Sequence, residues 1–243
     1  MADEGLVVEG IEAAYTKGMP ILSDVSMRAQ EGSVTAIIGP NGAGKSTLIK
    51  AIAGLVRVSN GTVMLRGRDI TNPRPDALKS LGLAYVPQSD NVFRSLTVAE
   101  NIALSLRHAG LAADGRRAEL FARFPDLATK TDDRAAGLSG GQRQFLALAM
   151  ALAAQPNVLL LDEPSAGLSP MAAEDVLAQV RSLADGGVTV LLVEQNVRQA
   201  LSMADHCYIL ADGKNQIDGP ARRLSSDPIV GEIYLGGKRM RAS

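Results

Sequence analysis

The chain has 243 residues, enough for one large domain or two small ones. Hydrophobic residues make up 46% and charged residues 21%, which is the composition of an ordinary soluble globular protein. Aromatic residues make up only 3% and the net charge is −1, so we do not expect a nucleic-acid-binding protein.

The single cysteine indicates the redox compartment of the protein, and the lengths of the apolar runs indicate whether the chain can span a membrane. Cys207 has no partner for an intrachain disulfide and fits a reducing compartment. It lies in an apolar run, so we expect a buried thiol and not a nucleophile. The N-terminus has no apolar stretch of signal-peptide length. The longest apolar run, residues 145–154, is about half of the ~20 residues that a membrane span needs. We therefore expect a soluble chain that reaches a membrane only through a partner.

The first third of the chain is expected to combine antiparallel strands with a strand, a loop and a helix. Short apolar runs predict strands at residues 6–11, 21–27 and 34–38. Apolar residues at helical spacing over residues 47–53 predict a helix that ends at Gly54. Asn60-Gly61 is the strongest hairpin dipeptide in the sequence and predicts a turn before residues 62–65.

The middle third shows helical patterns in place of strands. A strand is predicted at residues 81–86, just before Pro87-Gln88. Thr97 and Glu100 then form a capping box, which predicts the start of a helix. A second helix over residues 116–124 is expected to end at Pro125.

Strands return in the last third, in alternation with helices. Strands are predicted at residues 158–162, 188–193 and 207–211, and helices at 170–185, 197–204 and 229–235. Asp212-Gly213 predicts a hairpin turn. The pattern indicates an α/β fold with a mainly parallel core sheet, an N-terminal antiparallel β part and a helical insert. We expect a single domain over residues 1–243, with a helical subdomain at about 89–155.

A glycine-rich stretch lies between the predicted strand at 34–38 and the helix that follows. It fits the pattern G-x-x-x-x-G-K-[ST] and consists of Gly39, Pro40, Asn41, Gly42, Ala43, Gly44, Lys45, Ser46 and Thr47. The glycines let several backbone N–H groups point at one phosphate, and the helix N-terminus adds partial positive charge. Lys45 can reach the β- and γ-phosphates, and the Ser46 hydroxyl can bind Mg²⁺. The flanking strand and helix favour a phosphate loop over a turn that binds nothing.

Two adjacent carboxylates stand at the end of the predicted strand at residues 158–162. Asp162 and Glu163 point in different directions, so they can take different roles. Asp162 can hold Mg²⁺ through water, and Glu163 can polarise the attacking water as a general base. The alternative, that both acids merely cap the following loop, is less favoured because a phosphate loop is also present.

The most specific motif in the sequence is Leu138-Ser139-Gly140-Gly141-Gln142. Its serine and glycines open a helix, which makes a second anion site. One nucleotide could be clamped between the phosphate loop of one subunit and this motif of another, so we expect a dimer with composite sites. In isolation the motif would be interpreted as a flexible turn. Its position upstream of a strand that ends in Asp-Glu favours phosphate binding.

Four candidate segments each directly follow a predicted strand. They are the phosphate loop, Gln88, Asp162-Glu163 and Gln195. In a parallel sheet, ligands bind beyond the carboxyl ends of the strands. We therefore expect these segments to meet at one edge of the sheet and to form one active site.

Together these segments resemble the ordered motifs of ATP-binding-cassette (ABC) ATPases, over essentially the whole chain. The resemblance implies ATP and Mg²⁺ as cofactors. It also implies that Tyr15 stacks on adenine and that Gln88 senses Mg²⁺ and couples to a membrane partner. Ser139 and Gly141 would contact the γ-phosphate across the dimer, and residues 165–170 would link the two sites.

One position departs from the family pattern. After the strand predicted at residues 188–193 the family usually has a histidine that contacts the γ-phosphate, and here Gln195 stands in its place. His108 and His206 lie elsewhere in the sequence and cannot replace it. Glutamine can hydrogen-bond a phosphate but cannot carry a proton. Hydrolysis at this site is therefore expected to be slower or differently organised.

The compact length and the segments 193–196 and 234–237 resemble one of the two ATPase subunits of branched-chain amino-acid importers. This subgroup implies an ATPase that powers solute uptake, peripherally bound at the cytoplasmic face of the inner membrane. Its partners would be membrane permease subunits and, indirectly, a solute-binding protein. It would act as a homodimer or as a heterodimer with a second ABC ATPase. A permease helix could be received at residues 88–96, where the sequence is mildly apolar at Asn91, Val92 and Phe93.

Three other hypotheses stay open. An ABC ATPase for lipid or polysaccharide export shares the core motifs and is disfavoured only by the subgroup features. A soluble ABC ATPase that acts on ribosomes or DNA usually has two fused cassettes or long coiled-coil insertions, which are not found in this sequence. A module that only binds ATP is disfavoured by the intact Lys45, Asp162 and Glu163, although Gln195 keeps it open.

Overall fold

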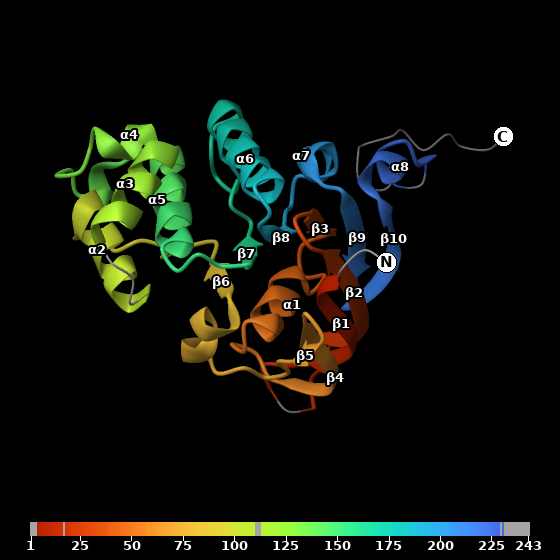
Figure 1. Cartoon of the computed structure of the whole chain (residues 1–243). Helices are drawn as coiled ribbons and strands as arrows, with labels where there is room; N and C mark the ends of the chain where they lie inside the picture. Colours follow the sequence, from red (N-terminus) through yellow and green to blue (C-terminus); the bar gives the residue numbers. More distant parts are fainter. Residues whose placement is uncertain (1–3, 17, 110–112, 229, 231–243) are drawn as a thin grey trace.

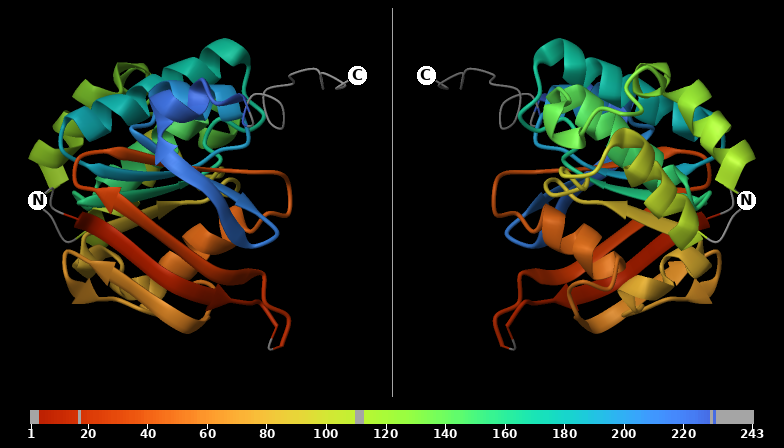
Figure 2. Two further views of the ribbon diagram at one scale, coloured as in Figure 1. Left: turned by 90° about the vertical axis from the view of Figure 1, so that its right-hand side faces the viewer. Right: turned by 90° about the vertical axis from the view of Figure 1, so that its left-hand side faces the viewer.

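Two β-sheets pack on either side of helix α1 (Lys45–Ile52). The computed structural model describes residues 4–16, 18–109, 113–228 and 230 (Figure 1). The two sheets have the strand orders β2-β1-β4-β5 and β10-β9-β3-β8-β7-β6. Figure 2 shows the six-stranded sheet with α1 and the smaller sheet on one face and most other helices on the opposite face. The α/β fold expected from the sequence is confirmed.

The smaller sheet is antiparallel throughout. Its strands are β1 (Glu4–Ala13), β2 (Leu22–Gln30), β4 (Val58–Leu65) and β5 (Arg68–Asp69). This sheet is the antiparallel β part predicted for the N-terminal region.

The larger sheet is parallel from β9 to β6, and β10 joins its edge antiparallel to β9. Its strands are β3 (Val34–Ile38), β6 (Leu83–Val86), β7 (Val158–Asp162), β8 (Thr189–Val193), β9 (His206–Ala211) and β10 (Lys214–Pro220). Every residue of β3, β7 and β8 is buried, because layers cover both faces of the sheet. This burial explains why these strands are continuous apolar runs in the sequence.

Four helices lie between β6 and β7 in the chain and gather beside the sheet (Figure 1). They are α2 (Val98–Ala109), α3 (Ala113–Arg123), α4 (Pro125–Ala128) and α5 (Gly140–Leu152). The other helices after α1 are α6 (Pro170–Asp185), α7 (Val197–Met203) and α8 (Ala221–Ser225), with short 3₁₀ turns at Pro75–Ala77, Lys79–Leu81 and Ala135–Gly137. All four helices of the first group fall inside the predicted insert at about 89–155. That they form a subdomain of a single domain stays a prediction.

Helix boundaries follow local capping signals. The Thr97 N–H donates to Glu100 Oε2 at 2.7 Å, and the Glu100 N–H donates to Thr97 Oγ1 at 3.1 Å, which confirms the capping box. Helix α6 begins at Pro170, after the N-cap Ser169, as predicted. Pro125 ends α3 but also begins α4, because proline is well suited to the first turn of a helix.

The hairpin predicted at Asn60-Gly61 is wrong. Both residues lie inside β4, where the pairing with β1 shifts in register between Glu9 and Glu12. Gly61 has a φ of +84°, and a Cβ there would lie 2.4 Å from the carbonyl oxygen of Glu9. The dipeptide forms an irregularity within the strand, because β1 lies close alongside it.

The C-terminal region, Cys207, the length of the helices and the surface charge each bear on an expectation from the sequence. The helix expected near residues 229–235 lies outside the described residues, except for residue 230, and the short helix α8 was not predicted. Cys207 is buried, and burial raises the pKa of its thiol to about 12, as fits a packed side chain. No helix in the described part of the chain is long and apolar enough to cross a membrane.

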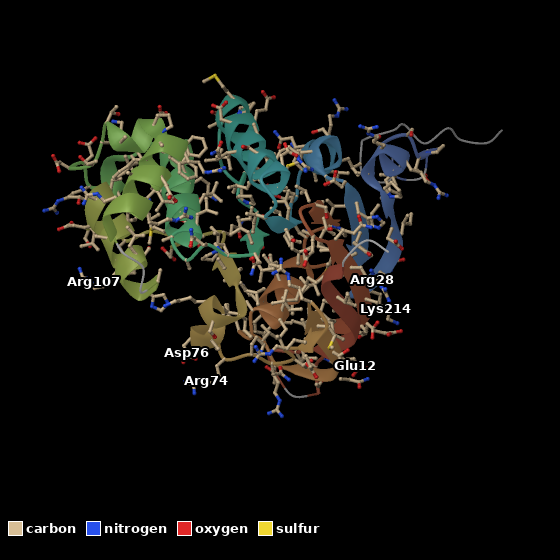
Figure 3. All side chains as sticks on the ribbon, viewed as in Figure 1. Glu12, Arg28, Arg74, Asp76, Arg107 and Lys214 are labelled. Atoms are coloured by element: carbon tan, nitrogen blue, oxygen red, sulfur yellow. The ribbon has the colours of Figure 1, made fainter. Side chains whose placement is uncertain are left out.

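Charged side chains of both signs lie around the outline of the molecule, including the ion pair of Arg74 and Asp76 (Figure 3).

Candidate functional site

The phosphate loop connects the end of β3 to the start of α1, as the sequence predicts. Gly42 and Gly44 have φ values of +81° and +96°, in the left-handed region that favours glycine. A Cβ on Gly44 would lie 2.7 Å from Leu22 Cδ2, so glycine lets the loop pass this close to β2. The two glycines allow the backbone to curl at the N-terminus of α1, where an anion is favoured.

The Lys45 side chain lies inside this curl. Its Nζ donates to the carbonyl oxygens of Gly39 at 2.9 Å and Pro40 at 3.1 Å, and the residue is only 5% exposed. Burial lowers the pKa of Lys45 below its ordinary value, and nearby carboxylates, chiefly Glu163, oppose that shift. The ammonium group is therefore held at the centre of the loop, within reach of a phosphate that the loop would bind.

Two oxygen ligands suited to Mg²⁺ meet beside the loop. Ser46 Oγ donates to Asp162 Oδ1 at 2.9 Å, although the two residues are 116 positions apart. Asp162 is 3% exposed, and Tyr85 on β6 donates to its other oxygen, Oδ2, at 3.4 Å. Mg²⁺ in nucleotide sites usually takes one or two protein oxygens together with phosphates and waters. The residues present fit a magnesium ion shared with a nucleotide.

Glu163 turns away from the axis of β7. It has a φ of +48°, its N–H donates to the Val193 carbonyl oxygen at 2.9 Å, and its Oε2 accepts from Gln88 Nε2 at 2.9 Å. Asp162 instead continues the ladder to β8. The two adjacent acids thus have different partners, as expected, and Gln88 is brought to the acid pair from the end of β6.

Gln195 joins the end of β8 to the phosphate loop. Its Nε2 donates to Asn41 Oδ1 at 2.6 Å, although the two residues are 154 positions apart. With the Ser46–Asp162 and Gln88–Glu163 contacts, this hydrogen bond brings all four predicted segments to one edge of the sheet. The convergence predicted from the strand ends is confirmed.

The motif at residues 138–142 opens α5, and its Gly140 lines the same hollow as Gln88. Ser139 Oγ accepts from the Gln142 N–H at 3.2 Å, and Gln142 Oε1 accepts from the Ser139 N–H at 3.1 Å, so the motif forms a capping box at the start of α5. Gly140 packs against the segment before α6, since a Cβ there would lie 2.8 Å from Leu168 Cδ2. Among the described residues, no hydrogen bond joins this motif to the phosphate loop. One chain thus carries two separate candidate phosphate sites.

Tyr15 lies in the loop between β1 and β2 and is 59% exposed. The far end of this loop reaches the phosphate loop, because a Cβ on Gly44 would lie 3.5 Å from the Ile21 carbonyl oxygen. The stacking of Tyr15 on adenine stays a prediction.

Sequence reasoning missed three polar residues around this edge: the half-buried Tyr85 and the buried Gln144 and Glu194. Glu194 is 1% exposed and Gln144 is 8% exposed, and both hydrogen-bond the chain just after Glu163. A signal for Glu194 was present, because it directly follows the buried strand β8, just as Glu163 directly follows β7.

A phosphate loop opposite an acid pair, on a parallel sheet with α1 beneath it, defines the class of P-loop ATPases. This chain belongs to the ABC transporter family, whose pattern matches residues 22–166. It is 45% identical to the probable branched-chain amino acid transport ATP-binding protein LivF of Archaeoglobus fulgidus, over 93% of this chain and 96% of that protein. It is 37% identical to the lipopolysaccharide export system ATP-binding protein LptB of Acidithiobacillus ferridurans, over 89% and 90%.

A solved structure supports the fold across the whole chain. The crystal structure of the ADP conformation of an ATP-binding cassette of an ABC transporter has a TM-score of 0.84 and 32% identity. The match covers 96% of this chain and 99% of that chain. The chain is thus an ATP-binding subunit of the ABC transporter family, a P-loop ATPase coupled to transport.

Proposed function

We propose that this chain hydrolyses MgATP to power the import of branched-chain amino acids through membrane permease subunits. The observation that carries the choice of solute is the 45% identity to a branched-chain amino acid transport protein over 93% of the chain. The hydrolytic part is supported by the convergence of Lys45, Asp162 and Glu163 at the edge of the sheet.

Each predicted residue has a role in this proposal. Tyr15 stacks on adenine, and the loop from Gly39 to Thr47 binds the phosphates, with Lys45 on the β- and γ-phosphates. Ser46, Gln88 and Asp162 hold Mg²⁺, directly or through water. Glu163 is the general base for the attacking water. Gln195 hydrogen-bonds the γ-phosphate from the end of β8.

The site is completed by a second ATPase subunit. Ser139, Gly140, Gly141 and Gln142 make no hydrogen bond to the phosphate loop within the described part of the chain, so they would serve the nucleotide of the partner. The partner is a second copy or a related ABC ATPase. The assembled pair would act at the cytoplasmic face of the inner membrane, bound to the permease subunits and served indirectly by a solute-binding protein.

Uptake of labelled solutes tests this function. Cells that lack this chain are expected to lose most of their high-affinity uptake of leucine, isoleucine and valine, while uptake of lysine is unchanged. The wild-type chain should restore uptake, and a Lys45→Ala variant should not. Normal uptake combined with impaired export of a lipid or polysaccharide would instead favour the export function of the LptB relatives.

A surface near Gln88 is the proposed docking site for the permease. Phe93 is 51% exposed, and its two neighbours in the sequence, Val92 and Arg94, line a hollow of about 280 Å³ together with Gln88 and others. An apolar side chain exposed beside a polar rim is typical of a protein contact. Because the hollow contacts Gln88, movement of a docked helix could reach Glu163 through the Gln88–Glu163 hydrogen bond.

Phe93→Asp is expected to lower solute uptake by at least about 10-fold, since a buried interface aromatic often contributes 2 kcal/mol or more. Basal ATP hydrolysis of the purified chain should stay within about 2-fold of wild type. Leu55→Asp is the matched control, because Leu55 is 50% exposed and follows α1 on another part of the surface. Unchanged uptake in the Phe93 variant, or an equal loss in the Leu55 variant, would contradict the docking site.

A further inference from the structure

Glu163 has a backbone conformation that a glutamate followed by a proline rarely adopts. Its φ of +48° is in the left-handed region, and the next residue is Pro164. A non-glycine residue stays in this region only where surrounding contacts hold it there, and a following proline restricts it further. On the N-terminal side, the hydrogen bond from the Glu163 N–H to Val193 holds the residue. The contacts on the C-terminal side must supply the rest.

Two buried side chains hold the residues that follow Glu163. Gln144 Nε2, on α5, donates to the Pro164 carbonyl oxygen at 2.9 Å. Glu194, at the end of β8, accepts from the Ser165 N–H at 3.2 Å and from Ser165 Oγ at 2.9 Å. One side chain thus comes from the helical group and the other from the core sheet. We call this arrangement of Gln144 and Glu194 around Pro164 and Ser165 the clamp.

Pro164 and Ser165 are buried, but the chain becomes open directly after them, where Ala166 and Gly167 are exposed. Residues 166–168, which follow the clamp, have a hollow of about 280 Å³ on one side and another of about 440 Å³ on the other. A segment with open space on both sides lacks the dense side-chain contacts that normally hold a chain in place. Just after Glu163 the chain is held by the hydrogen bonds of the clamp together with the backbone bond from the Ala166 N–H to the Glu163 carbonyl oxygen at 3.1 Å.

The clamp is joined at both ends to other parts of the site. Glu194 Oε2 also accepts from the Gln195 N–H at 3.3 Å, and the Gln195 side chain reaches Asn41 of the phosphate loop. On the other side, Gln144 Oε1 accepts from Asn91 Nδ2 at 2.7 Å, and Asn91 lies in the loop after Gln88. One hydrogen-bonded network therefore runs from the loop after β6, past Glu163, to the phosphate loop.

We infer that Gln144 and Glu194 are positioning residues for Glu163, which fix the direction of its carboxylate by holding Pro164 and Ser165 from two sides. The inference rests on the proposed role of Glu163 as general base. It assigns to Glu194 a function in the hydrolytic step although Glu194 does not touch the reacting atoms.

Glu194→Ala is expected to lower kcat for ATP hydrolysis by about 100-fold, because a shift of about 1 Å in a reacting group can cost that much. The KM for ATP should stay within about 3-fold, since the phosphate loop is unchanged. Glu194→Gln should keep kcat within about 5-fold of wild type. Its amide oxygen can still accept from the Ser165 N–H, and its NH₂ group can donate to the Ser165 hydroxyl, so both contacts to Ser165 are kept and only the 3.3 Å contact with the Gln195 N–H is lost.

Thr189→Val is the control for a lost buried hydrogen bond. Thr189 is 1% exposed at the other end of β8, and its Oγ1 accepts from the Gly32 N–H at 3.1 Å. This variant should melt at a lower temperature with kcat unchanged. If Glu194→Ala does not fold, Gln144→Leu provides the same test from the opposite side and should show the same loss in kcat at constant KM.

The outcomes separate this inference from the proposed function. A wild-type kcat in the folded clamp variants, with Glu163→Gln inactive, would overturn the inference and leave the base in place. An equal loss in Glu194→Gln and Glu194→Ala would mean that the negative charge near Lys45 matters and not the geometry, and would also overturn it. A fully active Glu163→Gln would overturn the proposed base itself.

Discussion

Replacing Glu163 by glutamine is expected to lower kcat for ATP hydrolysis by roughly 10²–10⁴-fold while ATP still binds, as is usual when a general base is lost. Glutamine has nearly the same size and can still hydrogen-bond Gln88, so the fold of the loop should be kept. It cannot accept a proton from water at neutral pH. Asp162, which faces Ser46 and not Gln88, is not placed to replace it.

The rate is measured as phosphate release by the purified chain under saturating MgATP. Glu174→Gln is the matched control, because Glu174 is exposed on α6 and the chemical change is identical. The control should hydrolyse ATP at the wild-type rate. Wild-type turnover in Glu163→Gln would remove Glu163 from the role of base.

The same variant also tests how the composite site is assembled. Because it should bind ATP without consuming it, its size in solution can be measured with and without MgATP. Conversion from monomer to dimer would mean that the chain pairs with itself, so that both sites operate with Gln195. A monomer that binds ATP would make an obligate heterodimer the leading arrangement, with two unequal sites if the partner carries a histidine at that position.

Lys45→Ala is expected to weaken ATP binding by at least about 100-fold and to bring hydrolysis below detection. A charge-assisted hydrogen bond to a phosphate contributes about 1.5–3 kcal/mol, and Lys45 can make more than one. No other positive group can take the place of the Lys45 ammonium, because Lys45 is 5% exposed and enclosed by the loop. Nearby carboxylates favour its charged form against the desolvation that lowers its pKa.

Binding is measured by titration with a fluorescent ATP analogue in the presence of Mg²⁺. Lys50→Ala is the matched control, since Lys50 lies in the last turn of the same helix and outside the phosphate loop. It should bind ATP as the wild type does. Wild-type affinity in Lys45→Ala would show that the loop is not the phosphate site, whatever the effect on hydrolysis.

Signals from residues close together in the sequence were enough to predict most of the helices and strands and the position of the phosphate loop. Helix α6 is bounded at both ends by residues that act within a few positions, Ser169 with Pro170 at the start and Gly186 after the end. The phosphate loop is set by its own glycines. The gathering of four segments followed from a general property of parallel sheets, in which strand ends that carry polar residues lie at one edge.

Other features could not be predicted, because they depend on residues far away in the chain. Asn60-Gly61 has the composition of a turn, yet its conformation is decided by β1, about fifty positions earlier, which pairs with β4. The start of α5, by contrast, was predicted, because the serine and glycines of the motif at 138–142 were expected to open a helix and Ser139 is its N-cap.

The sequence by itself determined the class of protein, since the phosphate loop, the acid pair and the motif at 138–142 each combine specific residues at fixed spacing. Only the tertiary structure decided how Glu163 is held. Its left-handed backbone depends on Gln144 and Glu194, which lie 19–31 positions away and reach Pro164 and Ser165 only when α5 packs against the sheet and β8 pairs with β7. Hydrogen bonds between distant segments leave no periodic pattern in a sequence, because their geometry exists only after the chain has folded.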